Sequence, residues 1–402
     1  MNLKYGTALT ILQLNLSPTD RLARCEATYA ASPPPFAMTE HARFHNPVDV
    51  HFGDGTLAHL PTLVGQRHAV LVTMPEARAL GMTGQIEALL GSRLAGVIDQ
   101  VSPNPDVREL APMYGDFWRR YGQCEVIVAL GGGSALDTAK LLMVAGDDDR
   151  FSTLVDALDA DGTFHPTRTK RLITIPTTAG TGSEVTPWAT LWDRHVKRKK
   201  YSLHLPETWP EAAIVDPQLT RSLPRAVTLQ SGLDALSHAL EAIWNVNANP
   251  ISDTFAVTAA RDMMRVLPQL MAAPDDAGLR RSAALAALQA GMAFSNTKTA
   301  LAHSISYDMT IRHGLPHGIA CSFTLPAVMR LAIGRRADRD AVLAKVFDGD
   351  VDGAPDKLTA FLNGLGVATE FSAYGVTEPE STAMIAAALD GPRGRNFIGA
   401  TV

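Results

Sequence analysis

The sequence predicts an α/β domain followed by an all-α domain. Short apolar runs alternate with helical patterns up to about residue 217, long Ala- and Leu-rich helical patterns follow, and a glycine loop joins one apolar run to a helix. Strands that alternate with helices favour a parallel sheet covered on both faces. We therefore place an α/β domain at residues 41–217, a helical domain at 218–402 and an N-terminal extension at 1–40.

The individual elements follow from the spacing of apolar residues. Strand patterns cover residues 48–52, 68–73, 96–101, 125–130 and 171–176, and helical patterns between them cover 85–94, 107–121 and 134–144. Later helical patterns cover 227–244, 252–267, 278–294 and 299–311, and we find no convincing strand beyond 217. Residues 31–35 contain three prolines, which helices and central strands do not tolerate, so we expect a loose extension and a start at Met38.

Composition excludes several classes of protein. The net charge of −5 leaves no basic surface for nucleic acid, and the one dense basic run, residues 194–200, is predicted to be a solvated loop. No apolar run reaches the roughly 18 residues of a membrane helix. The three cysteines, Cys25, Cys124 and Cys321, are far apart, which fits a reducing compartment. We expect a cytoplasmic protein without nucleic-acid or membrane partners.

Two loops suit a phosphate-bearing ligand. Gly131, Gly132, Gly133 and Ser134 join the apolar run 125–130 to a helical pattern, and residues 175–184 leave a strand through four hydroxyl side chains and two glycines. Glycines allow close backbone approach, and a helix N-terminus attracts anions. A tight turn and a helix-capping loop are the alternative interpretations.

A divalent metal site is indicated in the second half. Asp234 and His238 are four residues apart and share one helix face, and His303 and His317 follow downstream. One carboxylate with three imidazoles is a suitable ligand set for Fe(II), Zn(II) or a similar ion. Spacing alone leaves open a simple hydrogen bond between Asp234 and His238.

Taken in order, these motifs resemble the iron-containing (group III) metal-dependent alcohol dehydrogenases. The matching segments are GGGSALDTAK (131–140), PTTAGTGSE (176–184), IVDP (214–217), GLDALSH (232–238), AH (302–303) and PHG (316–318), within residues 46–402. The resemblance implies a dehydroquinate-synthase-like fold, with a Rossmann-type N-terminal domain and the active site in the cleft between the domains.

The resemblance also implies residue roles. It carries over Asp234, His238, His303 and His317 as metal ligands. It implies that NADPH or NADH is bound by Gly131, Gly132, Gly133, Ser134, Asp137, Thr177, Thr178, Thr181 and Ser183. Many members have an acidic residue after the first strand of this domain, where this chain has Met74, so we expect NADPH to be accepted at least as well as NADH. Many also have a proton-relaying histidine where this chain has Tyr307, so His313 and Tyr307 are the candidate proton donors.

Within the family, the chain is most similar to phosphonoacetaldehyde reductases. The similarity lies in TPWAT (186–190), KKYSLHLP (199–206) and RHGLPHG (312–318). It implies metal-dependent reduction of phosphonoacetaldehyde to 2-hydroxyethylphosphonate, in phosphonate natural-product biosynthesis. The alternatives are a generic alcohol dehydrogenase for small neutral substrates and a dehydroquinate-synthase-like lyase.

We expect Lys298 to bind the phosphonate. It precedes the helix that carries His303, so we place it at that helix N-terminus, where a cation gains nothing from the helix dipole. Asn296, Lys200, Trp188 and Arg312 are further candidates for substrate contacts. A lysine that points to water is the alternative. We also expect the chain to act as a homo-oligomer, a dimer.

Overall fold

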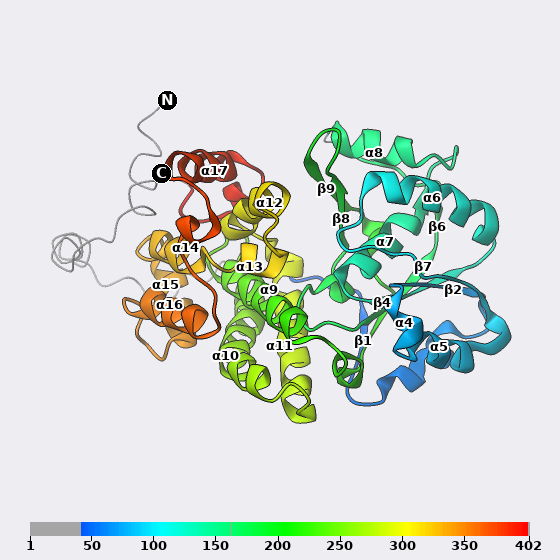
Figure 1. Ribbon diagram of the computed structural model, residues 1–402, viewed down its shortest axis with the longest axis horizontal. Coiled ribbons are helices and arrows are strands. Elements are labelled where there is room, and N and C mark those ends of the chain that lie inside the picture. Colours follow the sequence, from blue (N-terminus) through cyan, green and yellow to red (C-terminus); the bar gives the residue numbers. More distant parts are fainter. Residues whose placement is uncertain (1–41, 161, 401–402) are drawn as a thin grey trace.

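The computed structural model describes residues 42–160 and 162–400. It has an α/β half, on the right of Figure 1, and a helical half on the left. The order of an α/β part followed by an all-α part is therefore confirmed. The expected extension at residues 1–40, with Cys25 and Met38, lies outside the described residues.

A six-stranded parallel sheet forms the centre of the α/β half. Its strand order is β1 (Asp49–Phe52), β10 (Ala212–Val215), β7 (Arg171–Pro176), β4 (Val126–Gly131), β2 (Ala69–Thr73) and β3 (Leu94–Ile98). The sequence analysis predicted five of these strands, although it placed the start of β3 at residue 96 instead of Leu94. The sequence analysis missed β10, whose four residues are all buried.

The strand order creates a ligand-binding edge. From β2 the chain goes to β3 on one side and then to β4 on the other, so the direction of winding reverses between β2 and β4. Parallel α/β sheets bind ligands at such a switch point, at the carboxyl ends of the strands. Here those ends are Met74 after β2 and Gly131 to Gly133 after β4.

Both faces of the sheet are covered, because alternate strand residues point to opposite faces. On β2, Val70 and Val72 join one apolar cluster, while Ala69 and Leu71 join another. The covering helices are α3 (Leu60–Val64), α4 (Glu76–Ala79), α5 (Met82–Leu90), α6 (Val107–Tyr121), α7 (Gly133–Leu142) and α8 (Phe151–Asp159). The predicted helices at 107–121 and 134–144 correspond to α6 and α7.

A two-stranded hairpin that the sequence analysis missed lies beside the sheet. It consists of β8 (Trp188–Asp193) and β9 (Lys199–His204). The prediction of a solvated loop at 194–200 is wrong at its end, because Lys199 and Lys200 belong to β9. Its neighbours Tyr201 and Leu203 are buried, so strand alternation turns Lys200 and Ser202 toward the opposite side.

The second half is built from helices. They are α9 (Arg225–Ile243), α10 (Pro250–Ala272), α11 (Ala277–Thr297), α12 (Leu301–His313), α13 (His317–Ala320), α14 (Leu325–Ala332), α15 (Ala337–Val346), α16 (Ala354–Gly364) and α17 (Glu378–Asp390). The sequence analysis predicted the first four helices with ends that differ by a few residues, and it did not predict the later ones. Among the described residues, none of the helices combines the length and apolar character needed to cross a membrane.

Lys298 does not lie at a helix N-terminus, so that part of the prediction is wrong. It is the residue that ends α11, with φ of 67°. A left-handed residue cannot continue a right-handed helix, so the chain turns at Lys298 before α12 begins at Leu301.

Close backbone contacts join the two halves. A Cβ on Gly180 would lie 2.5 Å from the Ser231 carbonyl oxygen of α9, and one on Gly182 would lie 2.7 Å from the Cα of Gly291 on α11. Only glycine permits this approach. The loop after β7 is therefore pressed directly onto the helical half.

We predict that Gly318→Ala destabilises the protein and displaces His317. A Cβ at Gly318 would lie 1.9 Å from the backbone oxygen of Gln230, so α13 would have to move away from α9. We expect a loss of about 1–3 kcal/mol in the free energy of unfolding, measured by denaturant titration. Gly84→Ala is the control, because its Cβ would meet nothing within 4 Å in α5. Equal stability of the two variants would contradict the prediction.

Candidate active site

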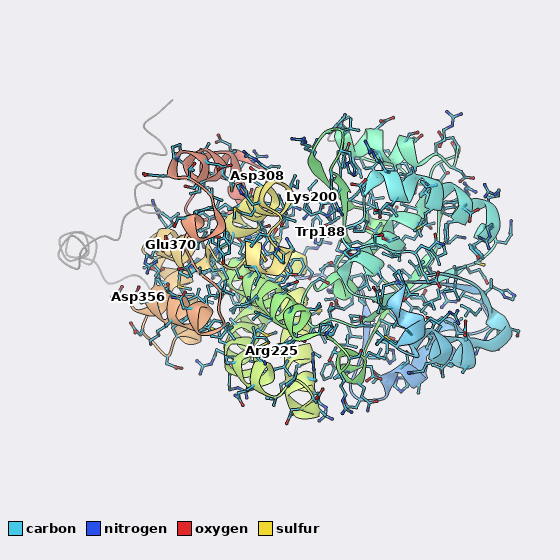
Figure 2. All side chains as sticks on the ribbon, in the orientation of Figure 1. Trp188, Lys200, Arg225, Asp308, Asp356 and Glu370 are labelled. Carbon is cyan, nitrogen blue, oxygen red and sulfur yellow. The ribbon has the colours of Figure 1, made fainter. Side chains whose placement is uncertain are left out.

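A cavity of about 720 Å³ lies between the two halves. Its size is within the range of sites for small ligands and cofactors. The labelled Trp188 and Lys200 mark its position in Figure 2. The lining residues from the α/β half include Gly133, Ser134, Asp137, Thr178, Thr181, Ser183, Trp188, Thr190, Trp192, Lys200 and Ser202, and those from the helical half include Asp234, His238, Lys298, Thr299, His303, Tyr307, His317, Arg393 and Asn396.

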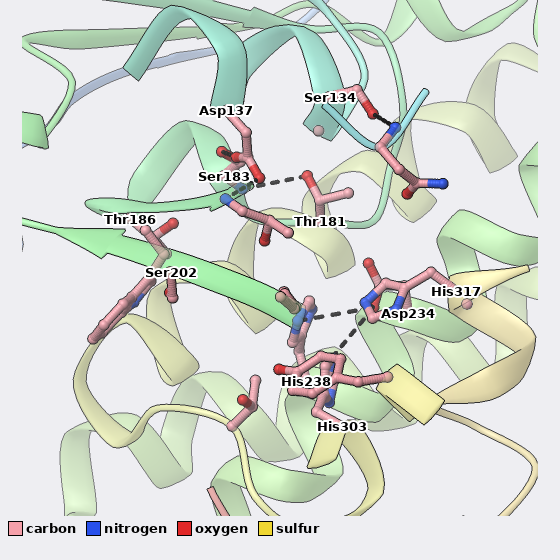
Figure 3. A pocket seen from close by; sticks show the side chains of 18 of the residues that line it. Ser134, Asp137, Thr181, Ser183, Thr186, Ser202, Asp234, His238, His303 and His317 are labelled. Atoms are coloured by element: carbon pink, nitrogen blue, oxygen red, sulfur yellow. Dashed lines mark hydrogen bonds and ion pairs between the residues drawn. The ribbon is translucent and has the colours of Figure 1, made fainter. Parts of the chain in front are cut away.

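The four predicted metal ligands converge at one end of this cavity (Figure 3). The Nε2 atoms of His238, His303 and His317 lie 3.8, 3.5 and 3.7 Å from Oδ1 of Asp234. Asp234 and His238 come from α9, His303 from α12 and His317 from the start of α13. Three separate helices thus place three imidazoles around one carboxylate.

Unsatisfied ring nitrogens support metal binding at this point. Nε2 of His303 is buried and has no hydrogen-bond partner among the described residues, although it faces Asp234. A buried polar atom without a partner is costly, and coordination to a cation would satisfy it. The side chains present therefore fit a divalent metal with oxygen and nitrogen ligands.

Glu241 orients His303, and the sequence analysis did not find it. Its carboxylate is fully buried and lies 2.7 Å from Nδ1 of His303. It also accepts hydrogen bonds from the backbone N–H groups of Ala300 and Ala302 at 2.8 and 2.5 Å. A carboxylate on Nδ1 holds the proton there and leaves Nε2 free as a ligand. The signal was available, since Glu241 follows His238 by three residues on the same helix face.

The charges of the ligand group favour a bound cation. Burial lowers the pKa of His238 to about 4 and that of His317 to about 3, so both rings are neutral near pH 7 and keep a lone pair for a metal. Burial opposes ionisation of Asp234, but the surrounding imidazoles, His238 first, lower its pKa below the usual value. Burial opposes charging of His303, but the neighbouring carboxylates of Glu241 and Asp234 raise its pKa. The group therefore combines an anionic carboxylate with the neutral imidazoles of His238 and His317.

Cys321 also borders the metal group. Its thiol lies 3.4 Å from Oδ1 of Asp234, and its residue is fully buried. Burial and the Asp234 charge raise the pKa of this thiol well above its usual value. The thiol donates to Asp234, and its Sγ belongs to a group in which the ligand atoms of Asp234, His303, His317 and Cys321 all lie within 4.8 Å of one another. Cys321 is therefore a further candidate ligand that the sequence analysis did not find.

The first glycine loop opens toward the cavity at the N-terminus of α7. Gly133 and Ser134 line the cavity, while Gly131 and Gly132 lie behind them. A Cβ on Gly133 would lie 2.8 Å from Cγ2 of Thr181, and one on Gly132 would lie 3.3 Å from Cγ2 of Thr178. The two predicted loops therefore meet, and this cradle fits a phosphate held by backbone N–H groups.

The charged side chains of Asp137 and Lys140 hold the second loop in place. Ser183 donates to Asp137 at 2.7 Å, and the Asp137 carboxylate also accepts from the backbone N–H of Thr190 at 2.8 Å. Lys140, fully buried, donates to the Ser183 carbonyl and hydroxyl and to the Trp188 carbonyl. Thr178, Thr181, Ser183 and Asp137 line the cavity, whereas Thr177 is buried behind it.

Met74 lies beside the glycine loop but does not line the cavity. Its Sδ would be 3.1 Å from a Cβ on Gly131, at the switch point of the sheet. No carboxylate occupies this position. Arg78, which follows it, forms an ion pair with Glu87 at 2.9 Å.

The predicted substrate residues divide into two groups. Trp188, Lys200 and Lys298 line the cavity, and Lys298 lies exposed at its rim, with its Nζ 5.9 Å from the centre of the Trp188 ring. Asn296 and Arg312 do not line it. The Asn296 amide is bonded to the backbone of His45, and Arg312 pairs with Glu380 at 3.2 Å on the exposed side of α12. The structure therefore does not support substrate contacts by Asn296 and Arg312.

Only one of the two predicted proton donors lines the cavity. His313, at the end of α12, pairs with Glu380 at 3.4 Å and does not line the cavity. Its predicted catalytic contact is thus unsupported, because α12 turns this residue away from the ligands. Tyr307 lines the cavity one helical turn after His303. Burial raises the pKa of Tyr307 to about 12, so the phenol keeps its proton.

Arg393 is a cavity residue that the sequence analysis missed. It lies in the loop after α17, with its Cζ 5.0 Å from the centre of the Tyr307 ring. Lys200 approaches the same ring, with Nζ 4.0 Å from its centre. No local pattern around Arg393 distinguishes it from the neighbouring Arg395, which is exposed.

Known proteins resemble this chain over both halves. The family model for "Iron-containing alcohol dehydrogenase" matches residues 47–217, and that for "Fe-containing alcohol dehydrogenase family, C-terminal" matches 228–401. The NAD-dependent methanol dehydrogenase of Bacillus methanolicus is 30% identical over 329 residues, covering 79% of this chain and 84% of that protein. The phosphonoacetaldehyde reductase of Streptomyces viridochromogenes is 37% identical over 214 residues, 52% of this chain and 53% of that protein.

A solved structure gives the same result. The sulfoacetaldehyde reductase from Bifidobacterium kashiwanohense, in complex with NAD+, superposes with a TM-score of 0.81 at 30% identity, covering 89% of this chain and 94% of that one. The expected dehydroquinate-synthase-like fold class is therefore confirmed.

We predict that Asp234→Asn and His303→Ala each lose bound metal and nearly all turnover while keeping the fold, because the first removes the anionic charge of a ligand and the second removes a ligand atom. Glu241→Gln should retain the ligands but lower metal affinity by roughly 10–100-fold, the usual effect of losing such an orienting partner. Metal content after gel filtration and the melting temperature are the measurements. Asp308→Asn, on the exposed side of α12, is the control. Stoichiometric metal in either ligand variant would show that the assignment is wrong.

We predict that Met74→Asp shifts cofactor preference from NADPH toward NADH. A carboxylate at this strand end would accept from the adenosine ribose hydroxyls and repel a 2′-phosphate. The ratio of kcat/KM for NADPH to that for NADH is the measurement, with Met74→Asn as an uncharged control. An unchanged ratio would mean that Met74 does not contact the adenosine ribose.

Proposed function

Because the chain belongs to the iron-containing alcohol dehydrogenase family, we propose that it reduces phosphonoacetaldehyde to 2-hydroxyethylphosphonate with a nicotinamide cofactor. The general class, NAD-dependent alcohol dehydrogenase, follows from the family. The finer proposal concerns the substrate, an aldehyde with an anionic end.

One observation carries the proposal. The cavity runs from the metal-ligand group to cations that have no carboxylate partner among the described residues. Lys200, Lys298 and Arg393 all line it, and none forms an ion pair within 42–160 and 162–400. Unpaired cations in a partly enclosed site favour an anionic ligand. Neutral alcohols would leave these charges unbalanced.

The protein's own groups suit the reduction of a short aldehyde. A bound divalent metal supplies a Lewis acid for the carbonyl, and the nicotinamide supplies the hydride. Asp234 and the three histidines would hold the metal, and the glycine cradle at α7 would hold the cofactor phosphates. Tyr307 lines the cavity one helical turn after His303, with Lys200 and Arg393 near its ring, and can donate a hydrogen bond from its neutral phenol.

The relatives support an anionic substrate. One is a phosphonoacetaldehyde reductase and another a sulfoacetaldehyde reductase, each named for a two-carbon aldehyde with a tetrahedral anionic group. The methanol dehydrogenase acts, by its name, on a neutral alcohol. The cations of the cavity favour the first kind of substrate for this chain.

We predict that the purified enzyme with Fe(II) oxidises one NADPH or NADH for each phosphonoacetaldehyde consumed, with a higher kcat/KM than for propanal. The reason is the cation group, which propanal cannot use. Absorbance at the reduced-nicotinamide band is the measurement, and the metal-free enzyme is the control.

Two other outcomes would contradict this assignment. A higher kcat/KM for propanal would indicate a generic alcohol dehydrogenase. Conversion of substrate without net oxidation of the cofactor would indicate a lyase, because a lyase returns its nicotinamide to the starting oxidation state in each turnover.

A further inference from the structure

Two of the cavity cations face one aromatic ring. Nζ of Lys200 lies 4.0 Å, and Cζ of Arg393 lies 5.0 Å, from the centre of the Tyr307 ring. Lys200 also lies 5.6 Å from the Trp192 ring. The ring faces attract both cations, but they do not cancel the charges. Two like charges are therefore held against the same ring, and the charge of Arg393 acts on Lys200.

The fold fixes the position of Arg393. Its Nε donates to Oγ1 of Thr299 at 3.2 Å, and Nδ2 of Asn396, in the same loop, donates to the Thr299 carbonyl at 2.9 Å. A Cβ on Gly394 would lie 2.1 Å from the Ala388 carbonyl oxygen, so the loop packs tightly on α17. The terminal nitrogens of Arg393 have no hydrogen-bond partner among the described residues, and they are the donors left for a ligand.

Lys200 is fixed by the hairpin. It lies opposite Trp192 in the β8–β9 pairing, and Tyr201 beside it in sequence is buried in the core. No hydrogen bond or ion pair involves its ammonium group in the described part of the chain. Burial lowers the pKa of this ammonium group well below the usual value, and repulsion by the charge of Arg393 acts in the same direction. A bound anion would relieve this repulsion.

We propose that Lys200 and Arg393 bind the head group of the substrate, and we call this pair the dianion seat. We propose further that the dianion seat selects a tetrahedral dianion over a monoanion or a neutral group. The proposal rests on the proposed function and identifies the residues that decide its substrate class. A bound anion favours the charged form of Lys200, and the two cations then match two negative charges, whereas a sulfonate would balance only one of them. The arginine fork and the lysine ammonium are both suited to phosphonate oxygens.

The location suits a short substrate. Tyr307 follows His303 by one turn of α12, a rise of about 6 Å along the helix axis. An aldehyde carbonyl directed to the ligand group would thus place a head group on the next carbon near the Tyr307 ring. Lys298 is different, because it is exposed at the rim and faces Trp188. We assign Lys298 to attracting the anion rather than seating it.

The test compares three aldehydes with the holoenzyme: phosphonoacetaldehyde, sulfoacetaldehyde and propanal. For the wild type we expect kcat/KM to fall in that order. For Arg393→Gln and Lys200→Met, we expect the ratio of kcat/KM for phosphonoacetaldehyde to that for propanal to fall by roughly 10–100-fold, the effect of losing one charge-assisted hydrogen bond. The ratio for sulfoacetaldehyde should fall less. Exposed Lys298, changed to Ala, should lower the phosphonoacetaldehyde ratio by only about two- to fivefold.

Arg395→Gln is the matched control, since Arg395 belongs to the same loop, is exposed, does not line the cavity and donates from its side chain to the Asp390 carbonyl. Its ratios should match those of the wild type. Arg393→Lys retains the charge without the fork and should recover part of the phosphonoacetaldehyde ratio. Calorimetric binding of 2-hydroxyethylphosphonate gives a readout without turnover and should weaken in parallel in Arg393→Gln.

The outcomes separate the seat from the proposed function. If the wild type reduces aldehydes but prefers sulfoacetaldehyde or propanal, or if the Arg393→Gln ratios equal those of Arg395→Gln, the dianion seat is wrong and a metal-dependent reductase remains. If no aldehyde is reduced, the proposed function fails. In that case, equal affinity of wild type and Arg393→Gln for 2-hydroxyethylphosphonate also overturns the seat.

Discussion

The buried carboxylate of Glu241 is the constraint on which the active site depends. It lies on α9, yet its hydrogen bonds go to the first N–H groups of α12 and to Nδ1 of His303. It therefore fixes where α12 begins, how that helix lies against α9 and which nitrogen of His303 faces Asp234. Without these partners a fully buried carboxylate would be very unfavourable, so the two helices and the charge stabilise one another. The metal-ligand group is a consequence of this arrangement.

The cavity exists because the two halves approach closely around it. Gly180 and Gly182 press the loop after β7 onto α9 and α11, and Gly318 presses α13 onto α9. These contacts close one side of the cavity, and alternate side chains of the β8–β9 hairpin line another side. Close-packed backbone at the base makes the site rigid, which suits a reaction that depends on the relative position of cofactor, metal and substrate.

Lys140 and Lys200 differ in the hydrogen-bond partners of their ammonium groups. Lys140 is fully buried and donates to three oxygen atoms, which offset the loss of water and leave it a structural brace. Lys200 has no such acceptors among the described residues and lies against the same ring as Arg393. Unpaired cations of this kind are the reason for the proposal that an anionic ligand, rather than another side chain, balances their charge.

The sequence by itself determined the elements and motifs that depend on neighbouring residues. Apolar runs specified β2, β4 and β7, glycines marked the cradle, and the Asp234 to His238 spacing placed two ligands on one face. Tertiary structure alone decided which distant side chains meet: it turned Lys200 inward on an unforeseen strand, brought Arg393 beside Tyr307, set Glu241 against His303, and moved His313 and Arg312 away from the cavity. The physical reason is that strand and helix periodicity act over a few residues, whereas convergence depends on packing between segments that lie far apart in the sequence.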